Sequence, residues 1–341
     1  MRTQIQDMTT GPLGRQIFLF SVPLILSNLL QVLFNMSDIA VVGRFSGSGA
    51  LGSVGSTATL VTLFTGFLIG MGSSVNVRVA RYLGAGDDTG VHRSVHTSLV
   101  LCVLVGAALT VLGLCFTRPL LVLMGTKDNL LDGAVLYLHI YLLGMPALAI
   151  YNFGNAVFSA AGDTKRPLRF LLIAGVLNIA LNLFFVIVCR WSVAGVALAS
   201  ILSQYVSAGL ILNAMAHSDA SFQLHFRALR PDPDEVRAIA GMGLAAGFQN
   251  SIFAIANLFI QSGVNRFDTL IVEGNSAAAN ADALIYDVMA AFYIACSSFM
   301  GQNLGARKKE RVLKSYFISL GYSFGIGMAL GLLLITCGPA F

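Results

Sequence analysis

Residues 16–43 read QIFLFSVPLILSNLLQVLFNMSDIAVVG, a run without a single Lys or Arg. A membrane-spanning α-helix needs about 20 consecutive, mostly apolar residues, and this run exceeds that length. It is also too long for the apolar part of a cleavable signal peptide, and no small-residue cleavage site follows it. The run therefore predicts a first transmembrane helix that stays in the mature protein.

Eight further runs of this kind follow, at 50–77, 94–117, 133–162, 170–189, 191–216, 238–265, 274–302 and 315–338. The chain is 56% hydrophobic and only 11% charged, with a mean hydropathy of +0.78. A soluble domain carries about 25% charged residues. We therefore predict an all-α polytopic membrane protein with nine transmembrane helices.

The Lys and Arg residues alternate between the two sides of such a membrane. With the N-terminus in the cytoplasm, 16 of the 21 fall inside, namely Arg2, Arg15, Arg78, Arg81, Arg93, Lys165, Arg166, Arg169, Arg227, Arg230, Arg237, Arg307, Lys308, Lys309, Arg311 and Lys314. The others, outside, are Arg44, Arg118, Lys127, Arg190 and Arg266. Cytoplasmic loops are the ones enriched in Lys and Arg, so we expect a plasma-membrane protein with a cytoplasmic N-terminus. The basic residues form no continuous stripe, so we expect no nucleic-acid partner.

The longest polar stretch, residues 217–237, reads HSDASFQLHFRALRPDPDEVR. Its end has the pattern of a helix start, because Asp232 can cap, Pro233 suits the first helical position and Glu235 follows three residues after the cap. We expect an N-lobe of six helices at 1–216, a cytoplasmic linker at 217–232 and a partial C-lobe at 233–341.

The two sides of this linker share a short repeat. Residues 83–85 and 304–306 both read Leu-Gly-Ala, at an offset of 221 residues, and each copy follows an apolar run and leads into basic residues. The agreement with helix order predicts a six-helix repeat whose halves are related by an axis along the membrane normal. The second copy holds only three of the six helices, so we expect either a fragment of a twelve-helix protein or a truncated product.

Two acidic residues, Asp38 and Asp287, fall inside the expected helices. Charges there are costly, so such residues are functional candidates by default. Asp38 lies about 33 Å along its helix, in the outer half of the membrane or at its edge. Asn35 and Gln31 share its helix face. We expect Asp38 to exchange a proton, the alternative being a helix-end carboxylate that faces interfacial water. For Asp287 the alternatives are a coupling role, a cavity position or a pair with Arg266.

Amide side chains recur inside the other apolar runs. Asn178 and Asn182 stand at i and i+4, on one helix face. Such amides either line a wet cavity or hydrogen-bond helices together. The candidates for a substrate cavity are Gln31, Asn35, Asn152, Asn155, Gln249, Asn250 and Asp287.

Metal and enzyme motifs give no match. His92, His96, His217 and His225 lie in the expected cytoplasmic loop regions and do not have the spacing of a metal site. The cysteines form no CxxC pair. We expect no metal, no cofactor and no enzymatic activity.

Four stretches resemble the multidrug and toxic compound extrusion (MATE) family of transporters. They are residues 35–44 (NMSDIAVVGR, after Pro23), 80–87 (ARYLGAGD), 162–167 (GDTKRP, before Asn178 and Asn182) and 301–306 (GQNLGA). They occur in family order and cover essentially the whole chain. The resemblance implies a twelve-helix protein of two six-helix lobes that exports amphipathic, often cationic compounds against a proton or sodium gradient.

The resemblance also implies residue roles. Asp38 matches the family's coupling-ion residue in the first helix, and Asn178 matches an Asn of the same polar cluster. Asn182 falls where many relatives carry an Asp. Gln249 and Asn250 lie near where a sodium-coupled branch carries a Glu, which favours proton coupling here. We expect a monomer.

Two other transporter hypotheses remain beside the drug exporter. One is a lipid-linked precursor flippase of the wider superfamily, which would need intramembrane Arg or Lys residues that the apolar runs lack. The other is an inactive fragment.

Overall fold

The computed structural model describes residues 7–264 and 269–337, and within them the chain is helical, without a strand. The helices are α1 (Leu13–Phe45), α2 (Gly47–Ala85), α3 (Asp88–Leu123), α4 (Asp128–Leu142), α5 (Met145–Ala160), α6 (Lys165–Leu183), η1 (Phe184–Val188), α7 (Ser192–Ala216), η2 (Phe226–Ala228), α8 (Pro233–Val264), α9 (Thr269–Gly305) and α10 (Lys309–Cys337). The all-α prediction is confirmed.

Each predicted transmembrane run corresponds to a helix or a pair of helices. In the described chain, 8 helices are long and apolar enough to cross a membrane, and the number reaches 9 if α4 and α5, bent by 48° where they meet, form one span. The fifth run continues from α6 into η1, a turn of π-helix. Of the charges used for the topology, Arg2 and Arg266 lie outside the described residues.

The break between α4 and α5 has a local cause. Pro146 lacks the N–H that would otherwise bond the Leu142 carbonyl four residues earlier. The Thr110 hydroxyl of α3 donates to that carbonyl instead, at 2.7 Å, and the Tyr205 hydroxyl of α7 donates to the Leu143 carbonyl at 2.9 Å. Backbone groups within a bilayer must be satisfied inside the protein, so these two bonds stabilise the bend.

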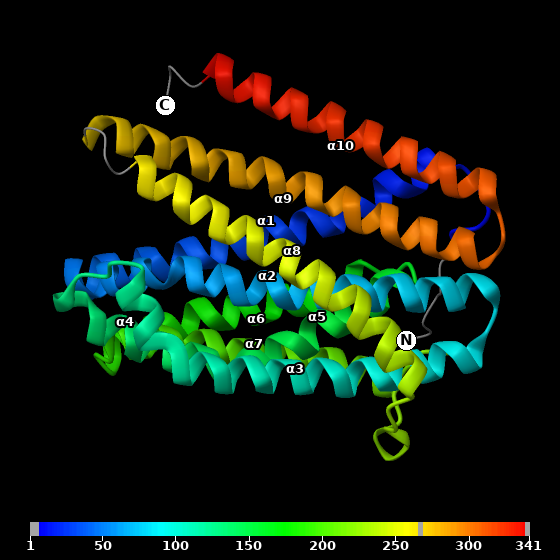
Figure 1. Cartoon of the computed structure of the whole chain (residues 1–341), viewed down its shortest axis with the longest axis horizontal. Coiled ribbons are helices and arrows are strands. Elements are labelled where there is room, and N and C mark those ends of the chain that lie inside the picture. The colour runs from blue at the N-terminus through cyan, green and yellow to red at the C-terminus, as the bar shows by residue number, and fades with distance from the viewer. Residues whose placement is uncertain (1–6, 265–268, 338–341) are drawn as a thin grey trace.

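Two turns with basic residues in or beside them gather at one end of the molecule: Arg81 and Arg93 lie in the helices that flank the first turn, and Arg307 and Lys308 lie in the second. The α2–α3 turn and the α9–α10 turn lie at the right of Figure 1, beside the start of α1. We call this the basic end, formed by residues 7–12, 86–87 and 306–308. It is fastened by the Met8 amide, which donates to the Gln302 side-chain oxygen at 3.1 Å, and by Arg311, which donates to the Gly11 carbonyl at 3.0 Å. Its cytoplasmic location stays a prediction.

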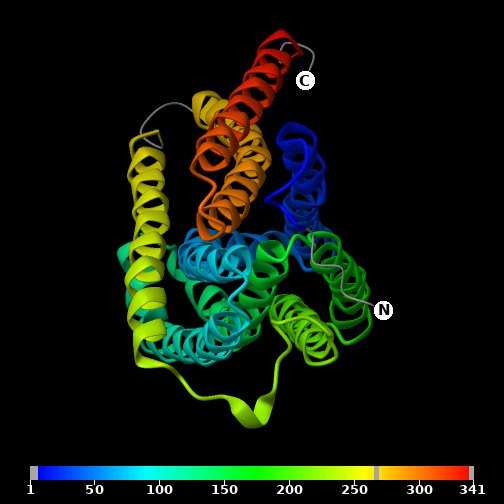
Figure 2. The ribbon, with the colours of Figure 1, turned by 90° about the vertical axis from the view of Figure 1, so that its right-hand side faces the viewer.

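Seen from the basic end, α9 and α10 lie on the opposite side of α2 from α3 and α7 (Figure 2). Helix α8 runs along one flank, and the linker crosses beneath the molecule to reach it (Figure 2). Apolar side chains of α2, α3, α4, α5 and α7 form the larger buried core, with fully buried Phe153 and Phe158 among them.

A second, smaller core joins α1 to α9 and α10. Ile17 and Phe20 of α1 pack there against Ala295 and Phe299 of α9, and the Phe20 and Phe299 rings meet edge to face at 5.5 Å. Val42, near the other end of α1, belongs to the larger core. One continuous helix therefore contributes to both cores.

Large apolar side chains stay exposed along the outer helices. Leu123 is 82% exposed, Leu104 61%, Phe317 65% and Ile335 75%. Soluble monomers rarely expose contiguous apolar surface on this scale. These side chains are suited to contact lipid tails, which agrees with the composition.

The two copies of the Leu-Gly-Ala repeat touch each other where α2 crosses α9. A Cβ atom on Gly84 would lie 1.9 Å from the Gln302 carbonyl oxygen, and a Cβ on Gly305 would lie 2.0 Å from the Arg81 carbonyl oxygen. Residues 84 and 305, like 81 and 302, are separated by the repeat offset of 221. This reciprocal contact, each copy's glycine against the other's carbonyl, is the pattern that a two-fold axis between the copies produces.

Candidate functional site

The acidic candidate of the first helix sits in a buried polar cluster. Asp38 is 8% exposed, and its carboxylate faces Asn178 and Asn182 of α6 and Ser200 of α7. One carboxylate oxygen accepts a hydrogen bond from the Asn182 side-chain amide. The other accepts from the Ser200 hydroxyl at 3.0 Å. Three helices thus deliver one side chain or more to the same point.

The two asparagines lie on one face of α6 and are linked to each other, as their i, i+4 spacing predicts. The Asn182 amide donates to the Asn178 side-chain oxygen at 3.2 Å, and the Asn178 amide approaches the Ser200 hydroxyl at 3.4 Å. The side-chain oxygen of Asn182 has no hydrogen-bond partner within the described chain, although Asn182 is fully buried. The cluster therefore holds one spare acceptor beside the carboxylate.

No ion pair to Asp38 is present among the described residues, so its partners there are neutral hydrogen-bond donors. An uncompensated buried charge is costly, whereas a protonated carboxyl is neutral and can donate a hydrogen bond itself. This arrangement suits a group that binds and releases a proton or a small cation.

Ser200 was missed by sequence reasoning. It stands in a run of α7 that also carries Ser203 and Ser207, and its partner Asp38 lies 162 residues earlier in the chain. The only available signal was a hydroxyl on an otherwise apolar helix, which Ser203 and Ser207 share; those two donate to carbonyls of their own helix.

The seven candidates for a substrate cavity differ in their exposure and in their hydrogen-bond partners. Gln31 and Asn35 are exposed on α1, and Gln249 is exposed on α8. Asn152 donates to the Leu148 carbonyl of its own helix at 2.9 Å, and Asn155 is half-buried.

The remaining two candidates lie at helix contacts. The Asn250 amide donates to the Gly66 carbonyl at 3.0 Å and so joins α8 to α2. Asp287 is half-buried on α9, and its backbone carbonyl accepts a hydrogen bond from the Asn28 amide of α1 at 2.7 Å. Asn250 therefore joins two helices, as amides in membrane helices often do. For all seven candidates, a place in the substrate cavity stays a prediction.

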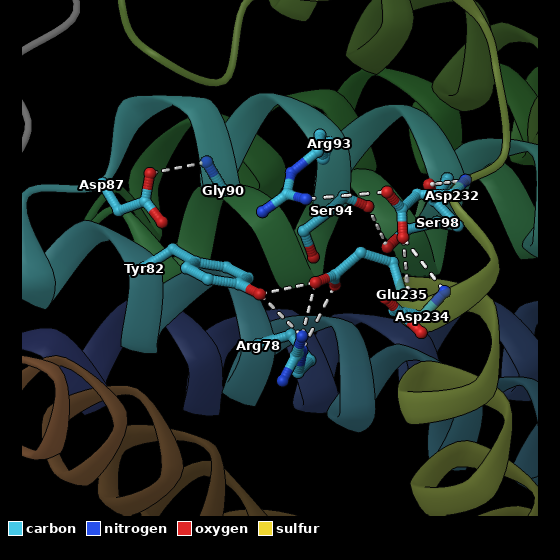
Figure 3. A network of polar contacts seen from close by, with 11 residues as sticks. Arg78, Tyr82, Asp87, Gly90, Arg93, Ser94, Ser98, Asp232, Asp234 and Glu235 are labelled. Atoms are coloured by element: carbon cyan, nitrogen blue, oxygen red, sulfur yellow. Dashed lines mark hydrogen bonds and ion pairs between the residues drawn. The ribbon is translucent and has the colours of Figure 1, made fainter.

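A second polar network lies near the basic end and ties α8 to α2 and α3 (Figure 3). Arg78 of α2 forms a salt bridge with Glu235 of α8, whose side chain is 3% exposed, and the Tyr82 hydroxyl donates to the same carboxylate. Arg93 of α3 lies 3.6 Å from the Asp232 carboxylate.

The start of α8 follows the predicted cap in part. Asp232 accepts hydrogen bonds from the backbone amides of Asp234 and Glu235 at 3.0 and 3.1 Å, which confirms it as the cap. Glu235 does not close a capping box, because its side chain bonds Arg78 instead. The Asp232 amide donates to the Thr97 hydroxyl of α3 at 3.0 Å. The Glu235 side chain therefore forms an ion pair with another helix instead of the hydrogen bond to the nearby Asp232 amide that its spacing allows.

Comparison with known proteins gives concordant matches. The family model MatE matches residues 23–184 and 238–340. The "Probable multidrug resistance protein YpnP" of Bacillus subtilis (strain 168) is 31% identical over 308 residues, which cover 90% of this chain and 68% of that protein. The "FAD transporter" of Shewanella oneidensis is 24% identical over 328 residues, covering 92% of this chain and 70% of that protein.

Solved structures share the fold. The crystal structure of MATE in the bent conformation superposes with a TM-score of 0.91 at 23% identity, over 100% of this chain and 76% of that chain. A MOP superfamily transporter from Pyrococcus furiosus gives a TM-score of 0.92 at 23% identity, over 100% of this chain and 75% of that chain. At this identity the likeness shows the fold alone.

Proposed function

Because the chain belongs to the MatE family, we propose that it is a cation-coupled antiporter that exports amphipathic drugs or toxic organic compounds across the plasma membrane. Members of this family are transporters, so the chain is a multi-pass membrane transporter and not an enzyme. The names of the multidrug resistance relatives support drug export. The observation that carries the proposal is the buried Asp38 cluster.

In this proposal the coupling ion is a proton, and Asp38 carries it. Its hydrogen-bond partners are Asn178 and Asn182, and the structure adds Ser200 to them. The ionised carboxylate is held by hydrogen bonds from Asn182 and Ser200. When a proton binds, the carboxyl becomes a donor, and the unpaired Asn182 side-chain oxygen can accept it after the amide turns over. The cluster therefore offers hydrogen-bond partners to both protonation states.

Helix α1 connects the Asp38 cluster to the helices of the second lobe. Its second half carries Asp38 to α6 and α7, and its first half packs against α9 and α10 through Phe20 and Phe299. Pro23 lies between Phe20 and Asp38 and removes one backbone hydrogen bond of the helix. Neutralising a charge whose unpaired burial costs several kcal/mol is enough to shift α1 between two packings.

The transport path in this proposal runs between the N-lobe at 1–216 and the C-lobe that begins at 233, with the linker at 217–232 between them. The amides of α1, α5 and α8, together with Asp287, are the proposed polar contacts for a cationic or amphipathic substrate. The chain acts as a monomer. Proton coupling is preferred to sodium coupling because α8 carries Gln249 and Asn250 and no acidic residue beyond its first turn in the described part.

The test compares Asp38→Asn with Asp287→Asn in proteoliposomes. Asparagine resembles the protonated carboxyl in shape and cannot titrate. We expect Asp38→Asn to bind a fluorescent organic cation while its proton-driven efflux falls to the rate of protein-free liposomes. Asp287→Asn should impair efflux less than Asp38→Asn does, because it alters a half-buried proposed substrate contact and leaves the coupling cluster intact.

Circular dichroism of both variants controls for loss of fold. Efflux at the normal rate by Asp38→Asn contradicts the proposal. Loss in Asp287→Asn alone moves the coupling site to α9. Efflux driven by a sodium gradient and not by a proton gradient corrects the coupling ion.

A further inference from the structure

Three histidines to which the sequence analysis gave no metal-binding role meet near the basic end, two of them one helical turn apart and the third 129 residues further along the chain. His92 and His96 stand one turn apart on the first part of α3, and His225 comes from the linker. Their rings are close, with centroids 3.9 Å apart for His92 and His96 and 5.8 Å for His92 and His225. One ring nitrogen from each residue lies within 4.8 Å of the other two.

We propose that His92, His96 and His225 form a binding site for a divalent transition-metal cation such as Zn²⁺, and that the ion fastens the linker to α3. Imidazole nitrogens are preferred ligands of zinc, copper and nickel, whereas magnesium and calcium prefer oxygen ligands. Three protein ligands with a water in the fourth position are an established zinc arrangement.

The cluster fits the ion after small side-chain movements. With Zn–N distances of about 2.0–2.1 Å, tetrahedral ligands lie about 3.4 Å from one another. The three nitrogens therefore need to close from at most 4.8 Å by rotation of the rings. His92 is half-buried and His225 is exposed, and in the described chain neither ring makes a hydrogen bond that such a rotation would break.

His96 already has the tautomer that a ligand needs. Its Nδ1 lies 2.8 Å from the His92 carbonyl oxygen, which can only accept, so Nδ1 carries the proton. Nε2 therefore carries the lone pair, which accepts the His225 backbone N–H at 3.0 Å and which a metal ion would take in place of that hydrogen bond. A ring N–H bound to a backbone carbonyl is the outer-shell contact that orients most metal-binding histidines.

Metal binding would exchange one attachment of the linker for a stronger one. Without metal, the linker is held to His96 by the His225 amide alone at this point. With metal, the His225 ring and His96 share the ion. The chain after His225 reaches α8 within a few residues, where Asp232 and Glu235 contact α3 and α2. The ion therefore holds the start of α8 in place as well.

The test measures Zn²⁺ affinity of the purified, tag-free chain in detergent by competition with a fluorescent zinc chelator. The variants are His92→Ala and His225→Ala, and the matched control is His217→Ala. His217 begins the same linker, and its ring is bonded to the Asn213 carbonyl, away from the cluster. His225→Ala keeps the backbone amide, so the metal-free attachment to His96 survives.

We expect one Zn²⁺ per chain in the unaltered protein. Loss of an outer-shell partner typically weakens metal binding about 10–100-fold. His92→Ala and His225→Ala each remove a direct ligand, so the Kd for Zn²⁺ should rise by more than that. His217→Ala should leave the Kd unchanged. His225→Cys restores a ligand, so it should recover tight binding and bind Cd²⁺ better than the unaltered chain does.

Limited trypsin digestion provides a second readout. Arg227 is exposed in the linker just after His225 and is followed by Ala228, so trypsin can cut at this residue. Zn²⁺ should slow cleavage there in the unaltered chain and in His217→Ala, and should have no effect in His225→Ala. The proposal is overturned if His225→Ala binds Zn²⁺ as tightly as the unaltered chain, if His217→Ala loses binding equally, or if Zn²⁺ leaves linker cleavage unchanged.

Discussion

Gly84→Ala should destabilise the protein by forcing α2 and α9 apart. The new Cβ would lie 1.9 Å from the Gln302 carbonyl oxygen, whereas ordinary van der Waals contact begins at 3.4 Å. The obstacle is backbone and has no alternative rotamer, so the helices must separate by about 1.5 Å.

The size of the effect follows from two opposing contributions. Alanine is favoured over glycine inside a helix by about 1 kcal/mol. Overpacking costs about 1–3 kcal/mol, and contact with a fixed carbonyl places this site near the upper end. We therefore expect Gly84→Ala to lower the free energy of unfolding by about 2 kcal/mol. Gly55→Ala is the matched control, because Gly55 lies on the same helix with no atom within 4 Å of its added Cβ. It should gain about 1 kcal/mol.

The reciprocal contact adds a sharper test. A Cβ on Gly305 would lie 2.0 Å from the Arg81 carbonyl oxygen, so Gly305→Ala requires nearly the same separation of the same two helices. Once Gly84→Ala has moved them apart, the second substitution should cost little. The second alanine also gains about 1 kcal/mol of helix propensity. The double variant should therefore lose only about 1 kcal/mol, less than either single variant, so the coupling energy lies near the top of the usual range of about 0.5–3 kcal/mol.

Equilibrium unfolding in mixed micelles of dodecylmaltoside and dodecyl sulfate, followed by circular dichroism, measures all four variants. If Gly84→Ala is as stable as Gly55→Ala, the close contact between α2 and α9 is wrong. If the two single losses add in the double variant, the substitutions do not share one helix movement.

The other predictions concern the α2–α8 ion pair and the topology. Arg78→Ala leaves Glu235, whose side chain is 3% exposed, without its cation, and should cost about 3–5 kcal/mol in the same unfolding assay. Arg118→Ala removes an exposed pair with Asp132 and should stay within about 1 kcal/mol, so equal losses would contradict the burial argument. For topology, a cysteine replacing exposed Arg227 on a cysteine-free background should resist a membrane-impermeant reagent in intact cells, and one replacing Lys127 should react. Labelling at position 227 but not at position 127 would show that the chain has the opposite orientation in the membrane.

The helices themselves could be predicted from the sequence. Apolar runs between basic residues indicated each span, and the cap at Asp232 was confirmed, because helix formation and capping depend on neighbours within about four residues. The i, i+4 spacing also placed Asn178 and Asn182 on one face, where the structure links them.

The sequence did not reveal contacts between distant segments. Nothing local pairs Ser200 with Asp38, Glu235 with Arg78, or His225 with His96, since 129 to 162 residues separate the partners. The sequence alone determined which segments are helical and which of their faces are polar, because those properties repeat with the helix period. Only the tertiary structure decided which faces meet, because that depends on packing: two glycines let α2 approach α9, and α1 is long enough to join both cores.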